Sequence, residues 1–114
     1  MGYYANGSGN IEFINPLNND KQKRIAEIRE YNYFDFIFYG SRKRNNATIG
    51  IDISFDGNYH GDSIEKGLNE IMKIADIKDG CMEFHGEDGD HWRFLYDPSE
   101  RRWREQTGHI VYEE

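Results

Sequence analysis

The sequence predicts an α+β domain with the ferredoxin-like order βαββαβ, a mostly antiparallel sheet, two helices on one face of it and a C-terminal β-hairpin extension. Three observations lead to this prediction. Residues 48–55 alternate apolar and polar side chains throughout, which is typical of a strand with one buried face. Two stretches, 25–31 and 64–75, place apolar residues at helical spacing among charged ones. Residues 97–100 (Asp-Pro-Ser-Glu) separate two strand-like runs and indicate a hairpin turn.

The first half of the chain yields a strand, a helix and a second strand. Residues 10–15 alternate and are followed by Pro16, which ends a first strand, while the glycine-rich residues 1–9 predict a flexible terminus or an entry turn. The helix that follows has cap candidates at 18–20 and an apolar stripe of Ile25, Ile28 and Tyr31. The nearly unbroken apolar run 33–39 predicts a strand buried on both faces, and 40–46 predicts a basic loop.

The second half continues in the same way. Ile49, Ile51, Ile53 and Phe55 are expected to lie beneath the helices. Asp62 and Glu65 have the spacing of a capping box that opens a second helix. The apolar stripe of this helix is Ile64, Leu68, Ile71 and Ala75, and it should end before Asp79-Gly80. The remaining predicted strands are 81–85, with Met82 and Phe84 on one side, and then 92–96, 101–106 and 109–112.

Composition predicts one domain, residues 1–114, in which 1–9 is the flexible segment. The single cysteine, Cys81, excludes an internal disulfide and suits a reducing cytoplasm. No apolar run is long enough to cross a bilayer, and the first residues lack the pattern of a signal peptide, so a cytoplasmic protein is expected.

Charge is unevenly distributed along the chain. Residues 1–50 contain seven Lys or Arg and five Asp or Glu, whereas residues 51–114 contain seven and sixteen, and the whole chain has a net charge of −7. An acidic surface disfavours direct binding of nucleic acid, which depends on neutralising phosphates. It suits a basic protein partner, although the same charge also serves solubility.

The candidate site is the segment 83–96, where carboxylates and histidines lie between two aromatic runs. Glu87, Asp88 and Asp90 are predicted to bind a partner, with Trp92 and Tyr59 as aromatic anchors. His85, Asp90 and His91 are weak candidates for metal ligands, and a solvent-facing hairpin loop explains the same residues better. We predict no catalytic residue and no cofactor, because nothing in this loop indicates a desolvated cleft.

Short motifs at both ends of the chain resemble a group of small phage and prophage proteins of unassigned function. They are the opening Met-Gly-Tyr-Tyr of residues 1–4, the acidic turn and tryptophan strand of 86–93, and the closing residues 108–113. The resemblance does not extend to the middle of the chain. It implies a viral accessory protein, and small acidic phage proteins such as anti-CRISPR proteins often bind a host defence protein.

The sequence therefore predicts a phage-encoded inhibitor of the anti-CRISPR type that acts in the host cytoplasm by covering a basic, nucleic-acid-binding cleft of a host protein. Direct binding of nucleic acid or membrane is not expected, and a homodimer is possible because the aromatic face of the hairpin could pack against a second subunit. The alternative is a protein that sequesters a nucleotide signal, or a small metal-dependent enzyme.

Overall fold

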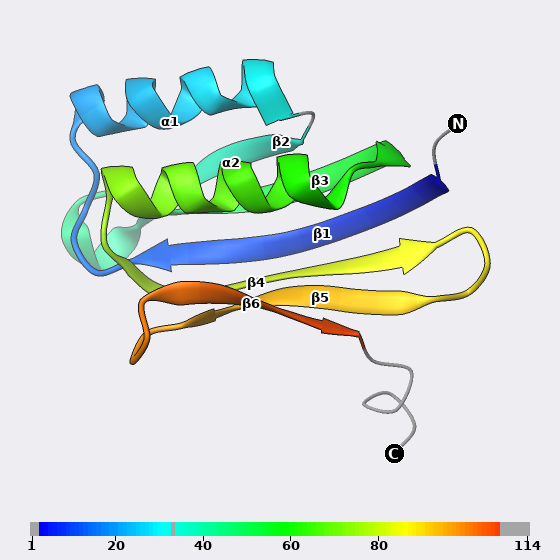
Figure 1. Ribbon diagram of the computed structural model, residues 1–114. Coiled ribbons are helices and arrows are strands. Elements are labelled where there is room, and N and C mark those ends of the chain that lie inside the picture. The colour runs from blue at the N-terminus through cyan, green and yellow to red at the C-terminus, as the bar shows by residue number, and fades with distance from the viewer. Residues whose placement is uncertain (1–2, 33, 108–114) are drawn as a thin grey trace.

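The computed structural model describes residues 3–32 and 34–107. Within this part of the chain, six strands form one antiparallel sheet and two helices lie on one face of it (Figure 1). In chain order the elements are β1 (Tyr3–Phe13), α1 (Asn19–Asn32), β2 (Asp35–Ser41), the short helix η1 (Arg42–Arg44), β3 (Ala47–Tyr59), α2 (Gly61–Ile74), β4 (Ile77–Gly86), β5 (His91–Asp97) and β6 (Arg102–Thr107). Among the described residues, neither helix has the length and apolar character needed to span a bilayer.

The sheet confirms the α+β class, but it does not match the exact ferredoxin-like plan. Its strands lie in the order β2-β3-β1-β4-β5-β6, so six strands replace the four of that plan. The last two strands form the predicted hairpin, and β5 joins the sheet beside β4. The predicted strand 109–112 lies outside the described residues. The face of the sheet away from the helices is called the open face below.

The alternation in β3 is confirmed from Ile51 to Phe55, whereas Ile49, which was expected beneath the helices, is only partly buried beside the shift in the β2–β3 register. Ile51, Ile53 and Phe55 are buried on the face that the helices cover, while Asp52 and Ser54 are exposed on the open face. The apolar stripe predicted for the second helix is confirmed as well. All four of its residues are buried: Ile64, Leu68, Ile71 and Ala75.

The two helices begin differently. The Asn18 side chain accepts a hydrogen bond from the Lys21 backbone N–H at 2.8 Å, as expected of an N-cap residue. The capping box predicted for α2 is wrong, because α2 begins at Gly61 and its N-cap residue, His60, makes no side-chain cap hydrogen bond. Asp62 therefore lies inside the first turn, where its negative charge favours the N-terminal end of the helix dipole.

Strand β2 corrects the prediction made for residues 33–39. It was expected to be buried on both faces, but it is the outermost strand at one edge of the sheet. Phe36 is buried beneath the helices, whereas Ile37 points to the open face and is 73% exposed. An edge strand can carry apolar residues on its exposed face. The unbroken apolar run in the sequence therefore did not mean that both faces of β2 are buried.

Strand β1 corrects the prediction made for the start of the chain. The glycine-rich residues 3–9, predicted as a flexible terminus, form the first half of a strand that pairs with β3 on one side and β4 on the other. A Cβ on Gly7 would lie 2.6 Å from the Phe84 ring, and one on Gly9 would lie 2.1 Å from the backbone oxygen of Cys81. Glycine is needed at these positions because β4 and its aromatic side chain approach β1 so closely.

The β5–β6 hairpin is held against α2 by Trp103. Its ring lies over Gly80, where a Cβ would come within 2.6 Å, and its indole N–H donates to the Leu68 backbone oxygen at 3.1 Å. Gly80 was predicted to stop the second helix, but it lies inside β4 and makes room for this ring. The helix ends earlier, at Ile74.

The close approach of β1 and β4 predicts different sensitivity at adjacent positions. Gly9→Ala should lower the free energy of unfolding by at least about 2 kcal/mol, because the added methyl group meets backbone atoms that cannot move aside alone. Ser8→Ala, on the exposed side of the same strand, should change it by less than about 0.5 kcal/mol. Urea unfolding followed by circular dichroism measures both, and equal losses would contradict the packing described here.

Candidate functional site

The acidic segment forms a tight turn between β4 and β5. The Gly86 N–H donates to the Asp90 backbone oxygen at 2.8 Å, and the Gly89 N–H donates to the Gly86 oxygen at 3.0 Å. Gly89 has a φ of 87°, a conformation that side-chain-bearing residues rarely adopt. The turn exposes Glu87, Asp88 and Asp90 to solvent.

The start of β1 fixes this turn in place. Tyr4 and Glu87 form a reciprocal pair: the Glu87 N–H donates to the Tyr4 backbone oxygen at 3.0 Å, and the Tyr4 N–H donates to Glu87 Oε1 at 2.8 Å. The Tyr3 hydroxyl accepts from the Asp88 N–H at 3.1 Å and donates to Asp90 Oδ2 at 3.3 Å. Tyr3 and Tyr4 of the Met-Gly-Tyr-Tyr opening therefore contact the acidic turn, which is far away in the sequence.

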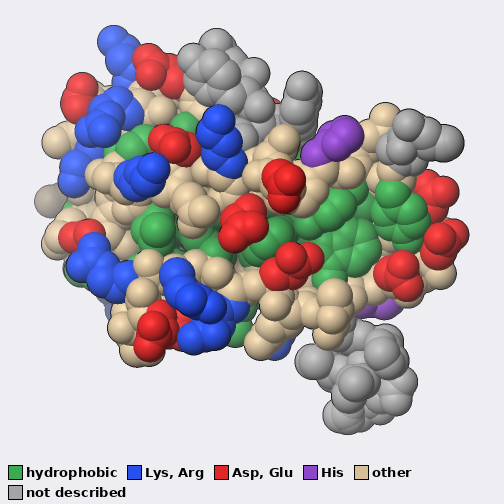
Figure 2. All heavy atoms as spheres, in the orientation of Figure 1, with side chains coloured by type: hydrophobic (Ala, Val, Ile, Leu, Met, Phe, Trp, Pro, Cys, Tyr) green, Lys and Arg blue, Asp and Glu red, His purple; other side chains and the backbone are tan. Residues whose placement is uncertain are grey.

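A fourth carboxylate, Asp56 of β3, lies at the same end of the sheet and accepts a hydrogen bond from the Tyr4 hydroxyl. This bond raises the pKa of Tyr4. We call Asp56, Glu87, Asp88 and Asp90 the acidic end; all four are exposed. Figure 2 shows carboxylates gathered at the right-hand end of the molecule, beside apolar surface. Sequence reasoning missed Asp56 and Tyr4, because only strand pairing brings them to the turn.

The predicted aromatic anchors, Trp92 and Tyr59, lie in and beside the core. Trp92 is only 7% exposed and its ring stacks on Phe84 at a centroid distance of 5.6 Å. Tyr59 is partly buried against Trp92, with ring centroids 4.9 Å apart, and burial raises its pKa to about 12. The indole N–H of Trp92 and the hydroxyl of Tyr59 are both buried, and neither has a hydrogen-bond partner among the described residues. Trp92 therefore belongs to the core and Tyr59 is partly buried beside it, whereas Tyr4 is 43% exposed.

The weak metal candidates lie on two sides of the sheet. The rings of His85 and His91 meet edge to face across β4 and β5 on the open face, with centroids 4.5 Å apart. The Asp90 carboxylate instead reaches Tyr3, whose ring contacts Trp92 on the other face. Among the described residues, no three or more His, Cys, Asp or Glu side chains are grouped as a metal site would require. The prediction of no metal and no cofactor stays a prediction.

A separate groove lies between the two helices. It is an open groove of about 510 Å³. Its lining is mixed in charge: Arg24, Glu27, Ile28, Lys66, Glu70, Lys73 and Ile74. Lys73 and Glu70 form an ion pair at 3.6 Å on its wall. Because the groove is lined by side chains of both charges, it has no electrostatic potential of one sign that would attract a charged ligand.

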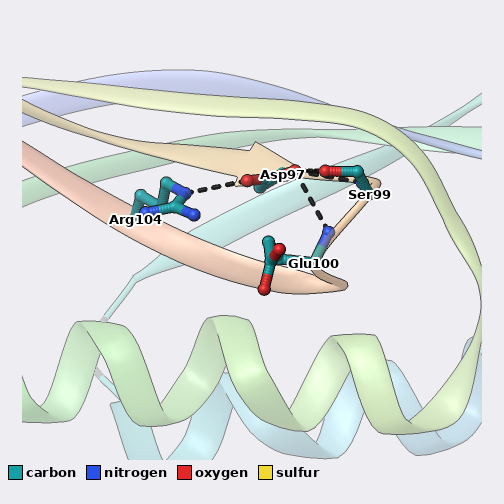
Figure 3. Close-up of polar contacts among 4 residues, drawn as sticks. All are labelled: Asp97, Ser99, Glu100 and Arg104. Atoms are coloured by element: carbon teal, nitrogen blue, oxygen red, sulfur yellow. Dashed lines mark hydrogen bonds and ion pairs between the residues drawn. The ribbon is translucent and has the colours of Figure 1, made fainter.

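Among the described residues, the most strongly shifted carboxyl group is that of Asp97, at the end of β5 and away from the acidic end. Asp97 Oδ2 accepts from Arg104 Nε at 2.8 Å, and Oδ1 accepts from the Ser99 hydroxyl at 2.7 Å and the Glu100 N–H at 3.2 Å (Figure 3). The Arg104 guanidinium, followed by the Ser99 hydroxyl, holds the pKa of Asp97 well below its usual range. Shifted carboxyl groups often mark functional sites. Here every partner belongs to the same hairpin, so Asp97 anchors the turn.

No family model, no curated protein and no solved structure matches this chain.

The Asp97 contacts predict a pH-dependent stabilisation of the hairpin. Because folding lowers the pKa of this carboxyl group, its contribution is present above the unfolded-state value of about 3.9 and is lost as the pH falls below it. Asp97→Asn should therefore lower the melting temperature near neutral pH, and the deficit should shrink as the solution is acidified. Differential scanning fluorimetry from about pH 7 to about pH 2 measures this change. Asp79→Asn, at an exposed carboxylate of β4, is the control. A deficit for Asp97→Asn that is unchanged across this pH range would contradict the assignment.

Proposed function

We propose that this chain is a small phage-encoded inhibitor that binds a host defence protein in the host cytoplasm and covers its basic, nucleic-acid-binding surface, in the manner of an anti-CRISPR protein. The phage origin is supported by the resemblance of the two ends of the chain to small phage proteins. The mode of binding is supported by the acidic end, where four exposed carboxylates lie together.

The observation that carries the proposal is that hydrogen bonds hold the backbone of the turn and the carboxylates of Asp56, Glu87 and Asp90 in place. Backbone hydrogen bonds close the turn, and the two tyrosines of β1 bind its backbone and side chains. A surface that is already ordered loses little conformational entropy when a partner binds. The guanidinium and ammonium groups of a nucleic-acid-binding cleft, which normally face phosphates, are the complementary groups.

Tyr4 is the aromatic side chain that we assign to this surface in place of Trp92 and Tyr59. Its ring is exposed and its hydroxyl is bound to Asp56, so it lies among the carboxylates. Tyrosine is enriched among the residues that dominate binding energy at protein interfaces. The net charge of −7 would speed encounters with a basic partner and would disfavour direct binding of nucleic acid.

We also propose that the ferredoxin-like plan describes part of this sheet, namely β1 to β4 with α1 and α2, and that the β5–β6 hairpin is an addition at the β4 edge. Support comes from the neighbours of β1, which pairs with β3 and β4, and from the pairing of β2 with β3. In this arrangement the addition supplies the turn that contains Glu87, Asp88 and Asp90.

The proposal predicts that charge at the acidic end controls inhibition. In a Glu87→Gln, Asp88→Lys variant, the amide oxygen of residue 87 can still accept from the Tyr4 N–H while the turn loses its negative charge. Association with the partner at low salt should slow by about tenfold, because long-range attraction raises association rates by this order or more. Inhibition of DNA cleavage across a panel of purified CRISPR effector nucleases identifies the partner, and surface plasmon resonance gives the rate.

The matched control makes the same change in net charge at the opposite end of the sheet, in an Asp79→Asn, Glu100→Lys variant. Both residues are exposed: Asp79 lies near the start of β4, and Glu100 lies in the β5–β6 turn. This variant should associate nearly as fast as the native chain. Equal association rates for both variants and the native chain would remove the acidic end from the mechanism. Absence of inhibition across the panel, together with tight binding of a nucleotide or a metal ion, would favour the alternative function.

A further inference from the structure

The two edges of the sheet differ in how well they are protected from pairing. Edge strands of soluble proteins usually carry charged side chains, because an uncharged edge offers its backbone groups to another strand. At one edge, three of the six residues of β6 are charged: Arg102, Arg104 and Glu105. At the other edge, β2 begins with Asp35 and continues with Phe36, Ile37, Phe38 and Tyr39. In the described part of the chain, β2 pairs with β3 on one side and no strand covers its other side.

Ile37 lies in the middle of this edge. It is 73% exposed, more than Ile14 at 51% or Tyr4 at 43%. It points to the open face, where its neighbour on β3 is Asp52. A single exposed isoleucine is common on protein surfaces. Residues 36–41 of this edge strand carry no charge, and an exposed isoleucine among them is a feature that pairing with another strand would bury.

We propose that a second copy of this chain pairs with β2, antiparallel and with the twofold axis at Ile37. The sequence around this residue reads Phe-Ile-Phe, so this register places Phe36 of one copy opposite Phe38 of the other. It also places each Ile37 opposite the same residue of the second copy. The segment is therefore complementary to itself, as a twofold interface requires.

The directions of the side chains agree with this register. Phe36 is buried beneath the helices and Phe38 packs partly against the same core, with their ring centroids 5.7 Å apart. Opposite residues of an antiparallel pair lie on the same face, so the two phenylalanine pairs would continue the core from one copy into the next. The two Ile37 side chains would cover each other on the open face. A register shifted by one residue would set Ile37, on the open face, opposite a phenylalanine on the face that the helices cover. Opposite residues of a strand pair must share a face, so this register does not fit.

Charge favours the same orientation. An exposed acidic residue, Asp35, begins β2, while two exposed basic residues, Arg42 and Lys43, follow its end. Antiparallel pairing brings the acidic start of each copy toward the basic end of the other. The β2–β3 register shifts between Tyr39 and Gly40, which limits the regular part of the strand to Asp35–Tyr39. A strand pair of this length is a small interface, so the dimer should form in a concentration-dependent equilibrium.

Sedimentation velocity from micromolar to millimolar protein tests the proposal, which concerns a different surface from the acidic end. The native chain should shift from monomer to dimer as its concentration rises. Ile37→Lys places two like charges at the axis and should weaken the dimer at least tenfold. The fold should remain intact because this side chain is exposed. Ile14→Lys, at an exposed isoleucine outside the strands, should leave the equilibrium unchanged.

The register is tested by cross-linking in a Cys81→Ser background, which removes the natural thiol. Ile37→Cys should form a disulfide between two copies on mild oxidation, because residues opposite each other in a strand pair lie close to disulfide distance. Ser54→Cys, on the same face but one strand further in, should remain a free thiol. A native chain that stays monomeric throughout, an Ile37→Lys dimer as stable as the native one, or failure of Ile37→Cys to cross-link would overturn the proposal.

Discussion

The close contact between β1 and β4 determines much of this structure. Gly7 and Gly9 have no side chain where Phe84 and the backbone of β4 pass, so the two strands pair along nearly the whole of β1. Phe84 in turn is the ring against which Trp92 stacks. The first described strand is therefore central in the sheet, and it joins the β2–β3 half to the half that contains the C-terminal hairpin.

The same contact builds the acidic end. The first residues of β1 lie beside the last residues of β4. Tyr3 and Tyr4 therefore reach the β4–β5 turn and bind its backbone and its carboxylates. A glycine-rich strand thus connects packing in the core with the order of a charged surface. The proposed function depends on that order, since carboxylates on a flexible loop would have to be fixed when a partner binds.

The sequence predicted the elements whose signals are local. The alternation in β3 and the helical spacing of Ile64, Leu68 and Ile71 each report one buried face, and the structure confirms both. Residues 3–9 were misjudged, because glycines usually indicate flexibility and their need here comes from Phe84, far along the chain. The candidate site was predicted in part. Its turn carboxylates are exposed as expected, but burial of Trp92 depends on ring packing between strands that no local pattern reveals.

The position of β1 is the central claim of this account, and native-state hydrogen exchange measured by NMR tests it most directly. Amide protons that bond to neighbouring strands exchange only when the sheet opens. If residues 5–11 form the middle of the sheet, their bonded amides should be protected as strongly as those of Ile51 and Ile53 in β3. Exchange of residues 5–9 at the rate of an unstructured chain, with β3 still protected, would show that the glycine-rich segment is a free terminus and would contradict the account.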